Sequence, residues 1–398
     1  MRLSDPFLCP MRNSYLTYLL VGIIIALSLT ACSSKGIELS SAQRLTGQID
    51  SLLLSRADRG VFSGTVAIGT QTEMIHHSAY GIANRTFDLP MRTDFRFDIA
   101  SVNKSMIAAL VMIAVEEGLL TTDERLVNLL EGYSYTGSYH QDITVHKLLT
   151  HTSGLPDYNA VNEELAANNY RAFKRLHFSN SEYIDFISRL EPVAEPGTTF
   201  HYSNFGYHLL SLLLENLYNM PFDELLKLKI SDPLGMDRTY STTSNEAIFD
   251  ETVDAYRFDE EAQGWIKNSF IDLTIGRRVF STSENLYRWA KAMNDTTFLS
   301  EESLNQMTIN HLNELEEEVS YGYGWVVYNE GDDFSMGNLN IDKPYIIHGG
   351  STEGYKSILI NIDDGEWILS ILANSGNRTN ELELAQGIIE IIKSYNSL

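Results

Sequence analysis

The sequence predicts an α+β protein, an α/β sandwich in which a mainly antiparallel sheet is flanked by N- and C-terminal helices and interrupted by a helical insertion. Strand-like segments occur near both ends of the chain, whereas helical segments and polar loops dominate its middle. The last strands follow one another closely, and the turn Asp363-Asp364-Gly365 between two of them indicates an antiparallel hairpin. With 398 residues and 43% hydrophobic content, the chain can bury a sizeable core and form more than one lobe.

The expected elements follow from the spacing of apolar residues in chain order. At the N-terminal side we expect a helix over 42–56, strands over 62–69 and 74–82, a half-buried strand with Phe95, Phe97 and Ile99, and a buried helix over 106–120. Beyond these we expect helices over 207–218 and 222–230, strands over 323–328, 345–347, 355–362 and 367–373, and a last helix over 382–395. This order predicts a discontinuous sheet domain over 42–120 and 311–398, and a mainly helical domain over 121–310.

Residues 1–31 have the pattern of an export signal. Arg12 precedes an apolar run over 15–31 that ends in Leu29-Thr30-Ala31-Cys32. This tetrad resembles the bacterial lipoprotein box, which implies removal of 1–31, lipid attachment to Cys32 and a tether over 32–41. An uncleaved membrane helix is the alternative, although the run is at the short end of what spans a bilayer.

The lipoprotein interpretation implies a location in the bacterial cell envelope, anchored to a membrane through Cys32. The residue after that cysteine is Ser33 rather than aspartate, which by family habit favours the outer membrane, facing the periplasm. Met1 and Met11 both remain open as the start of the chain.

The composition excludes several classes of function. A formal net charge of −24 disfavours binding to phosphate backbones, and no basic patch with interleaved aromatic residues offsets it, so we expect no nucleic-acid partner. Cys9 and Cys32 are the only cysteines, and both lie in the targeting segment. The remaining chain therefore has no thiol nucleophile, disulfide or cysteine metal site, and covalent catalysis would use oxygen or lysine. No Gly-x-Ser-x-Gly elbow of the α/β-hydrolase kind is present.

The segment Ser101-Val102-Asn103-Lys104 lies where a predicted strand leads into a predicted helix. Residues three apart on a helix share a face, which would place the Lys104 amine one turn from the Ser101 hydroxyl. Serine needs a neighbouring base to act as a nucleophile, and lysine serves as one only if its surroundings lower its pKa toward neutrality. The helix start also offers the Ser101 N–H to a developing oxyanion. The alternative is a capping serine followed by an exposed lysine.

Two further segments carry groups suited to acyl transfer. Tyr202-Ser203-Asn204 offers a phenol that can relay a proton and an amide that can hold both a lysine and a substrate carbonyl. His348-Gly349-Gly350-Ser351 lies on a predicted strand, and glycines weaken a strand unless something approaches its backbone closely. A substrate along that edge is one such reason, with the Ser351 N–H as a second oxyanion donor. The alternatives are a surface turn containing a tyrosine and a hairpin turn with a solvated histidine.

Ser-x-x-Lys, Tyr-x-Asn and His-x-Gly, in this order, resemble the motifs of the serine β-lactamase-like family. This family includes class C β-lactamases, D-alanyl-D-alanine carboxypeptidases, D-aminopeptidases and related esterases. The stretches 148–155, 202–207 and 232–236 are also similar to family signatures, and the similarity extends over 42–398. The resemblance implies the DD-peptidase/β-lactamase-like fold.

The resemblance also implies a role for each matching residue. Ser101 is the acylated nucleophile, Lys104 its base, Tyr202 the proton relay, and Asn204 holds Lys104 and the substrate. The strand with His348 and Gly350 lines the substrate site, and the N–H groups of Ser101 and Ser351 are the oxyanion donors. No metal or organic cofactor is implied.

The implied substrate is a small molecule or a peptide that carries a peptide, amide or ester bond, with D-alanyl cell-wall peptides as one candidate. A non-hydrolytic penicillin- or peptidoglycan-binding or sensor protein is the first alternative, and a weak β-lactamase is a further one.

The pattern departs from the family in two places. Its third motif is His-Gly-Gly rather than Lys-Thr-Gly, so a permanent cation is replaced by a mostly neutral imidazole, which resembles the peptidase and esterase branches more than potent β-lactamases. Arg277 and Arg278 stand where relatives often carry glycines. We expect one of them to contribute a cation at the pocket mouth, with two solvated loop arginines as the alternative.

Overall fold

The computed structural model describes residues 40–135, 137, 139–157, 178–242, 244, 248–268, 277–315, 317–352 and 354–395. The predicted signal, Cys32 and nearly all of the tether lie outside these residues. The chain divides into two units, 1–44 and 45–398. In the first unit, residues 40–44 are described and begin helix α2 (Ser41–Asp58). Over the residues described, no helix is both long enough and apolar enough to span a bilayer.

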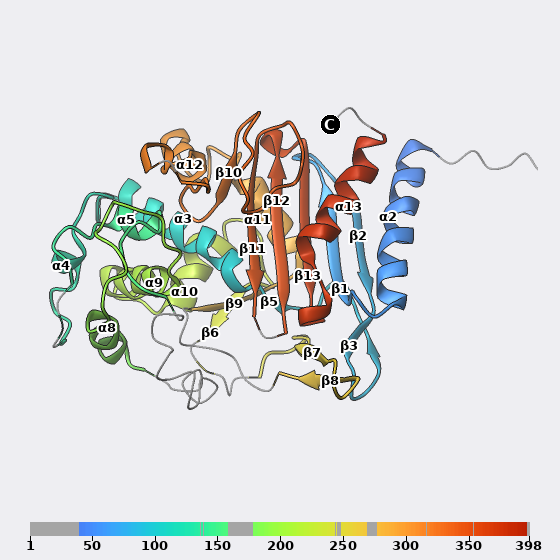
Figure 1. Cartoon of the computed structure of the whole chain (residues 1–398), viewed down its shortest axis with the longest axis horizontal. Coiled ribbons are helices and arrows are strands. Elements are labelled where there is room, and N and C mark those ends of the chain that lie inside the picture. The colour runs from blue at the N-terminus through green and yellow to red at the C-terminus, as the bar shows by residue number, and fades with distance from the viewer. Residues whose placement is uncertain are drawn as a thin grey trace, which may run out of the picture. The chain divides into compact units, whose positions relative to one another are not determined.

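A six-stranded antiparallel sheet forms the centre of residues 45–398 (Figure 1). Its order is β10-β11-β12-β13-β1-β2. The strands are β1 (Gly64–Gly69), β2 (Met74–Tyr80), β10 (Val326–Tyr328), β11 (Tyr345–Ser351), β12 (Lys356–Ile362) and β13 (Trp367–Ala373). The sheet joins the two ends of the chain because β1 pairs with β13, with Gly64 opposite Ala373. These features confirm the predicted α+β class.

Helices cover both faces of this sheet, so its strands are apolar on both sides. On one face, Ile49 and Leu53 of α2 share a core with Ile388 of α13 (Glu381–Lys393), which Figure 1 shows running along the sheet. On the other face, α11 (Ser283–Ala292) packs against β1, β12 and β13. Buried residues of α3 (Asn103–Glu116) belong to the core on this second side.

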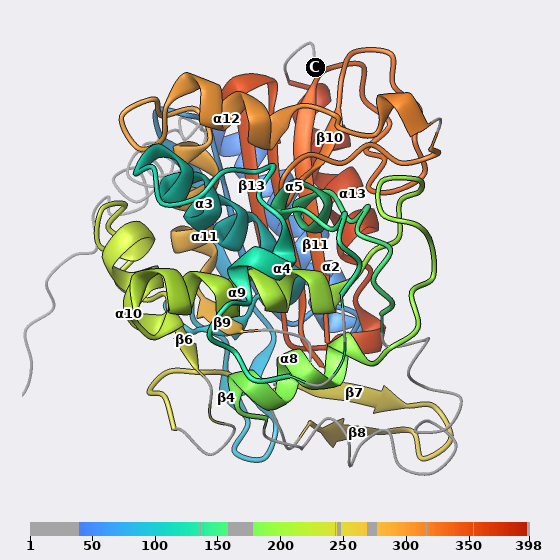
Figure 2. The ribbon, with the colours of Figure 1, turned by 90° about the vertical axis from the view of Figure 1, so that its left-hand side faces the viewer.

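The other helices of the described residues form a lobe that Figure 2 shows in front of the strands. They are α4 (Leu126–Leu129), α5 (Val145–Leu149), α8 (Asn180–Ser188), α9 (Asn204–Tyr218), α10 (Phe222–Leu226) and α12 (Glu301–Thr308). Helix α9 packs against both α3 and α5. It begins where the Ser203 side chain accepts a hydrogen bond from Gly206 N, which satisfies one of the free N–H groups at the helix start. The cap therefore fixes the start of the helix directly after Tyr202.

The half-buried strand predicted around Phe95, Phe97 and Ile99 is observed as β5 (Phe97–Asp98). Six further short strands were not predicted from the sequence, namely β3 (Ile82–Asn84), β4 (Leu89–Pro90), β6 (Tyr240–Thr242), β7 (Tyr256–Asp259), β8 (Gly264–Lys267) and β9 (Arg278–Ser281). Strands β5, β9 and β6 form a small sheet of their own. Residues 45–398 form one compact unit. The predicted domain boundaries at residues 120 and 310, which lie inside this unit, stay a prediction.

Two predicted elements have different bounds because of glycines and local turns. The strand expected over 323–328 is reduced to Val326–Tyr328. Gly324 has a φ of +75°, and a Cβ there would lie 2.6 Å from Ser105 Cα, so the chain bends to pass close to α3. The buried helix begins at Asn103, earlier than expected, directly after the 3₁₀ turn Ala100–Val102.

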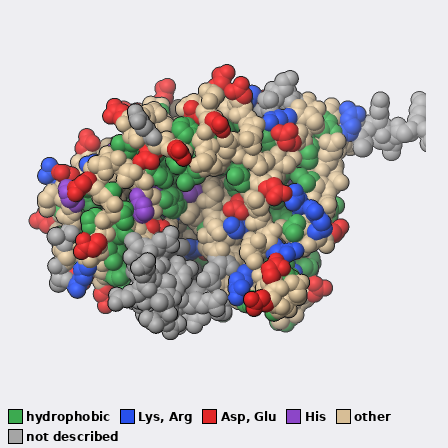
Figure 3. Space-filling view, in the orientation of Figure 1, with side chains coloured by type: hydrophobic (Ala, Val, Ile, Leu, Met, Phe, Trp, Pro, Cys, Tyr) green, Lys and Arg blue, Asp and Glu red, His purple; other side chains and the backbone are tan. Residues whose placement is uncertain are grey.

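Acidic side chains are dispersed over the face drawn in Figure 3 rather than gathered in one patch. This distribution is consistent with a solvated surface for a chain whose formal net charge is −24.

Candidate active site

Ser101 lies in the 3₁₀ turn between β5 and α3. The residue before it, Ala100, has a φ of +48°, which is unfavourable for any residue with a Cβ. The backbone N–H of Ala100 donates to Asp98 Oδ1 at 2.8 Å, which holds this turn in place. Asp98 was not identified from the sequence as a site residue. The one signal in the sequence was its position three residues before Ser101.

The carboxylate of Asp98 forms a buried ion pair with Arg278. Arg278 Nε donates to Asp98 Oδ2 at 2.8 Å, and the two side chains are 3% and 4% exposed. The two residues lie close because β5 pairs with β9, Asp98 standing opposite Phe280. A buried carboxylate with a guanidinium partner and an N–H donor has its desolvation cost offset. This pair supports the turn that carries Ser101.

The expected role of the paired arginines is wrong. Arg278 is neutralised by Asp98, while Arg277 lies 2.5 Å from Glu215 Oε2 and 3.0 Å from Asn180 Oδ1. Neither guanidinium is offered to an anion at the pocket mouth. The alternative of two solvated arginines is also wrong, because both side chains are largely buried in these ion pairs.

Lys104 contacts Ser101 as the helical spacing predicted. Its Nζ lies 3.1 Å from Ser101 Oγ and donates to Asn204 Oδ1 at 2.8 Å. The side chain is 3% exposed. Burial lowers the pKa of Lys104 to about 7; the Asp157 carboxylate opposes the shift and the Arg278 cation adds to it. The capping-serine alternative, with an exposed lysine, is therefore wrong.

Asn204 is oriented by a carboxylate that was not identified from the sequence. Its Nδ2 donates to Asp157 Oδ2, and its backbone N–H donates to Asp157 Oδ1, both at 3.0 Å. These bonds turn the amide oxygen of Asn204 toward Lys104. No motif signalled Asp157, because 47 residues separate it from Asn204 in sequence.

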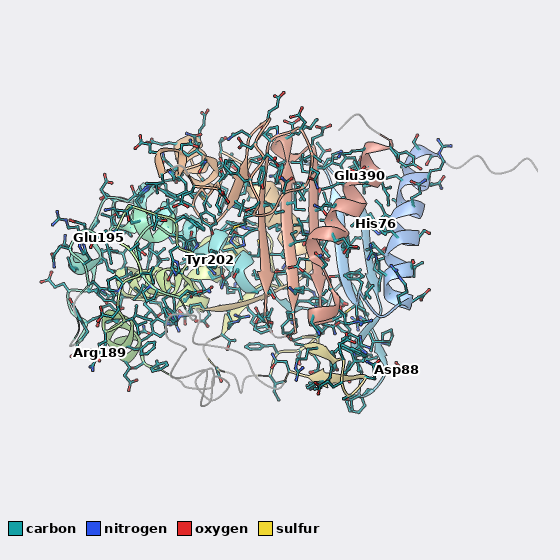
Figure 4. All side chains as sticks on the ribbon, in the orientation of Figure 1. His76, Asp88, Arg189, Glu195, Tyr202 and Glu390 are labelled. Atoms are coloured by element: carbon teal, nitrogen blue, oxygen red, sulfur yellow. The ribbon has the colours of Figure 1, made fainter. Side chains whose placement is uncertain are left out.

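Tyr202 lies between the helices and the sheet (Figure 4). Lys104 Nζ is 5.0 Å from the centre of its ring, and the ring packs against His151 at a centroid distance of 4.3 Å. Burial raises the pKa of the Tyr202 phenol above its ordinary value, and a hydrogen bond with Ser101 opposes the rise. The phenol is thus protonated near neutral pH. His151, whose Nδ1 accepts from Ser203 N at 3.1 Å, packs in this loop.

Gly350, the second glycine of the third motif, is required because other parts of the protein pack closely against it. A Cβ on Gly350 would lie 2.3 Å from Ser357 Oγ, 2.5 Å from Ile99 O and 3.0 Å from Ser101 N. The Ser357 hydroxyl also donates to Ile99 O at 2.7 Å, which ties β12 to the chain just before Ser101. We expected a substrate to be what approaches this strand. At Gly350 the approaching group is instead the Ser101 turn.

His348 belongs to strand β11 and is 4% exposed, so the alternative of a solvated histidine in a turn is wrong. Its Nδ1 lies 2.7 Å from Gly349 O and must carry a proton to bond a carbonyl. Its Nε2 then accepts from the Tyr321 hydroxyl at 3.1 Å. Burial and the nearby Lys104 lower the pKa of His348 to about 3, so the ring is neutral.

A cavity of about 550 Å³ opens beside these groups. It is lined by Ser101, Tyr202, Val326, Met336, Gly337, Ile347, His348, Gly349, Gly350, Ser351, Ile358, Glu381 and Leu382. Strand β10 pairs with β11 only as far as Ile347. The following residues of β11, His348–Ser351, are therefore not paired with β10 and lie beside Ser101. Within the described ranges, no group of three or more His, Cys, Asp or Glu side chains is placed to hold a metal ion.

Comparison with protein families matches residues 49–391 to the family described as Beta-lactamase. Among curated proteins, the chain is similar to Penicillin-binding protein 4* of Bacillus subtilis, with 25% identity over 366 residues, which cover 86% of this chain and 74% of that protein. It is also similar to Esterase EstB of Burkholderia gladioli, with 27% identity over 208 residues, or 50% of each chain.

Solved structures share the fold. An octameric penicillin-binding protein homologue from Pyrococcus abyssi has a TM-score of 0.73 at 23% identity, over 87% of this chain and 77% of that one. A D-amino acid amidase from Ochrobactrum anthropi SV3, complexed with D-phenylalanine, has a TM-score of 0.68 at 22% identity, over 88% and 99% of the two chains.

Proposed function

This chain belongs to the beta-lactamase family of hydrolases, and from that premise we propose that it is a serine hydrolase that forms an acyl-enzyme on Ser101. Its substrates would be peptides, amides or esters, with D-alanyl cell-wall peptides as one candidate. The observation that carries the proposal is the 3.1 Å contact between Lys104 Nζ and Ser101 Oγ, made by an amine whose pKa is lowered to about 7. Such an amine is substantially uncharged at neutral pH and can act as a base.

Acylation begins when neutral Lys104 accepts the proton of the Ser101 hydroxyl. Oγ then attacks the carbonyl carbon, and the carbonyl electron pair moves to oxygen. Asn204 supports this step because its amide oxygen accepts from Lys104 Nζ at 2.8 Å and so keeps the amine in place. The resulting oxyanion would be held by the N–H groups of Ser101 and Ser351, each typically worth about 3 kcal/mol of barrier.

Collapse of the tetrahedral species breaks the bond to the leaving group, which takes up a proton as it departs. Tyr202 would supply that proton, because its raised pKa keeps it a phenol, and the Lys104 ammonium would return a proton to it. In the second half of the reaction a water molecule gives up a proton to the same groups and attacks the ester carbon. The acid product then leaves, and the Ser101 hydroxyl is restored.

Strong β-lactam hydrolysis is not expected. The third motif presents neutral His348 where the family pattern has a lysine ammonium, and both neighbouring arginines are engaged with carboxylates. A carboxylate on a β-lactam would therefore find no strong cation among the described residues that line the cavity.

The proposal is tested by kinetics on p-nitrophenyl acetate, a D-alanyl-D-alanine peptide and nitrocefin, with the Ser101→Ala variant as control. We expect turnover of the ester or the peptide that Ser101→Ala abolishes, and labelling of Ser101 by a fluorophosphonate. A stable Ser101 adduct without turnover, seen by mass spectrometry, would favour the non-hydrolytic binding or sensor protein instead. Absence of both turnover and labelling would falsify the proposal.

We also propose that the protein is exported and anchored to the outer membrane, facing the periplasm, by lipid on Cys32. The support is the lipoprotein box Leu29-Thr30-Ala31-Cys32, which lies outside the described residues. Metabolic labelling with an alkynyl fatty acid should tag the protein, and Cys32→Ser should remove the tag. Cys9→Ser is the matched control because these are the chain's two cysteines, and equal labelling of both variants would contradict the proposal.

A further inference from the structure

The cavity beside Ser101 continues past Gly349 onto the face of the sheet that carries α13. Gly349 stands opposite Ile358 in the pairing of β11 with β12, so the Ile358 side chain lies beside a position that has none. A Cβ on Gly349 would meet nothing closer than Ser357 O at 4.0 Å. This glycine therefore leaves open space, in contrast to Gly350, which is packed against the Ser101 turn.

The walls of this extension are apolar. Ile347 and Ile358 are buried strand residues, and Leu382 comes from the first turn of α13. Met336 comes from the loop between β10 and β11, where its carbonyl accepts from the Tyr328 hydroxyl at 3.0 Å. Met336 and Leu382 are half-buried and face the cavity. The extension is thus a preformed apolar surface in the same cavity as the Ser101 side chain.

Glu381 is the single charged side chain among the described residues that line the cavity. It pairs with Lys356, whose Nζ lies 3.5 Å from Glu381 Oε1 and which is not among those lining residues, so the carboxylate of the pair faces the cavity. A substrate carboxylate in this extension would lose its hydration and meet this carboxylate rather than a free cation.

We propose that this extension binds a neutral apolar substituent on the acyl or leaving group of the substrate, and that Glu381 excludes substituents ending in a carboxylate. The inference rests on the proposed function, since the substituent is placed by a bond to the carbonyl that Ser101 attacks. It assigns Met336, Ile358 and Leu382 as specificity residues and narrows the substrate class to neutral esters and amides with an apolar side chain.

The first test uses the full-length chain and two ester series. In one, p-nitrophenyl esters carry acetyl, butyryl or hexanoyl groups, and in the other, acetate esters carry alcohols of increasing length. We expect kcat/KM to rise roughly fourfold per added methylene in at least one series until the extension is filled. The p-nitrophenyl monoester of adipic acid, which matches hexanoate but ends in a carboxylate, should be poorer by about tenfold or more.

The second test uses variants that fill the extension or change its charge. Gly349→Val adds a side chain in open space and should lower the ratio of kcat/KM for the longest to the shortest ester about tenfold. Gly264→Val is the matched control, because a Cβ there meets only Ala262 O at 3.7 Å and the residue is in a strand outside the cavity. Glu381→Gln should raise kcat/KM for the adipate monoester relative to hexanoate.

The outcomes separate the two proposals. Turnover that depends on Ser101 but shows no dependence on chain length in either series, or a preference for the adipate monoester, overturns the apolar subsite and leaves the proposed function standing. An unchanged chain-length ratio in Gly349→Val also overturns the subsite. No Ser101-dependent turnover of any ester overturns the proposed function and this assignment with it.

Discussion

Asp98 and Arg278, separated by 180 residues in sequence, form a buried ion pair behind the nucleophile turn. One oxygen of Asp98 accepts from Arg278 Nε at 2.8 Å, and the other accepts from Ala100 N at 2.8 Å. The pair thus connects β9 to the residue just before Ser101. It also places a fixed positive charge where it helps to lower the pKa of Lys104.

Breaking this pair at one partner should destabilise the protein more than removing both. Asp98→Asn leaves the Arg278 cation buried without its counter-ion and should lower the free energy of unfolding by about 3–5 kcal/mol. The double variant Asp98→Asn/Arg278→Met should lose less, because no buried charge is left unpaired. Urea unfolding of Asp98→Asn, Arg278→Met and the double variant measures the coupling energy between the two side chains. If the stability losses of the two single variants added up to that of the double variant, the coupling would be contradicted.

The same double variant should change the pH dependence of activity. Removing a nearby cation makes protonation of Lys104 easier, so the pH needed to obtain the neutral amine rises. The midpoint of kcat/KM against pH should therefore shift upward. Arg277→Met, which removes the cation paired with Glu215, is the control and should leave the midpoint in place. A shift of equal size in both variants would show that the effect is not specific to Arg278.

The wild-type pH profile should report the titration of Lys104. The active form carries the neutral amine, so kcat/KM should be low at acidic pH, rise through a midpoint near the Lys104 pKa of about 7, and reach a plateau above it. Lys104→Arg should lower kcat/KM by about 10³-fold or more and abolish the rise, because a guanidinium is not deprotonated in this range. A wild-type kcat/KM that does not change between pH 5 and 9 would contradict the assignment of Lys104 as the base.

Tyr202→Phe should affect substrates according to their leaving groups. The phenol is kept protonated by burial, so its expected role is to donate a proton to the departing atom. An amide nitrogen needs that proton, whereas p-nitrophenolate leaves without one. Amide hydrolysis should therefore fall by about 10²–10³-fold and p-nitrophenyl ester hydrolysis by much less. Equal losses for both substrates would indicate that Tyr202 acts through the packing of its ring against His151.

Two adjacent glycines of β11 should tolerate alanine very differently. Gly350→Ala places a Cβ 2.5 Å from Ile99 O and 3.0 Å from Ser101 N, and it should lower the free energy of unfolding by about 1–3 kcal/mol and impair acylation. Gly349→Ala adds its methyl group to open space and should cost little stability. Denaturation curves and burst kinetics on p-nitrophenyl acetate compare the two, and similar stability losses would contradict the packing described here.

Much of the fold could be predicted from the sequence because its signals are local. The apolar spacing of 42–56 and 382–395 indicated the helices observed as Ser41–Asp58 and Glu381–Lys393. Other short strands, such as β6 and β9, could not be predicted. Three or four residues carry too little periodicity, and their pairing is set by contacts between distant segments.

The sequence by itself determined that Ser101 and Lys104 lie on one face of a helical turn, because residues three apart share a face wherever the helix lies. Only the tertiary structure made this proximity a 3.1 Å contact and decided its chemistry. Burial lowers the pKa of Lys104, Asp157 orients Asn204, and Asp98 takes up the charge of Arg278. Each of these effects depends on groups far apart in the chain, since desolvation and Coulomb interactions act through space rather than along the sequence.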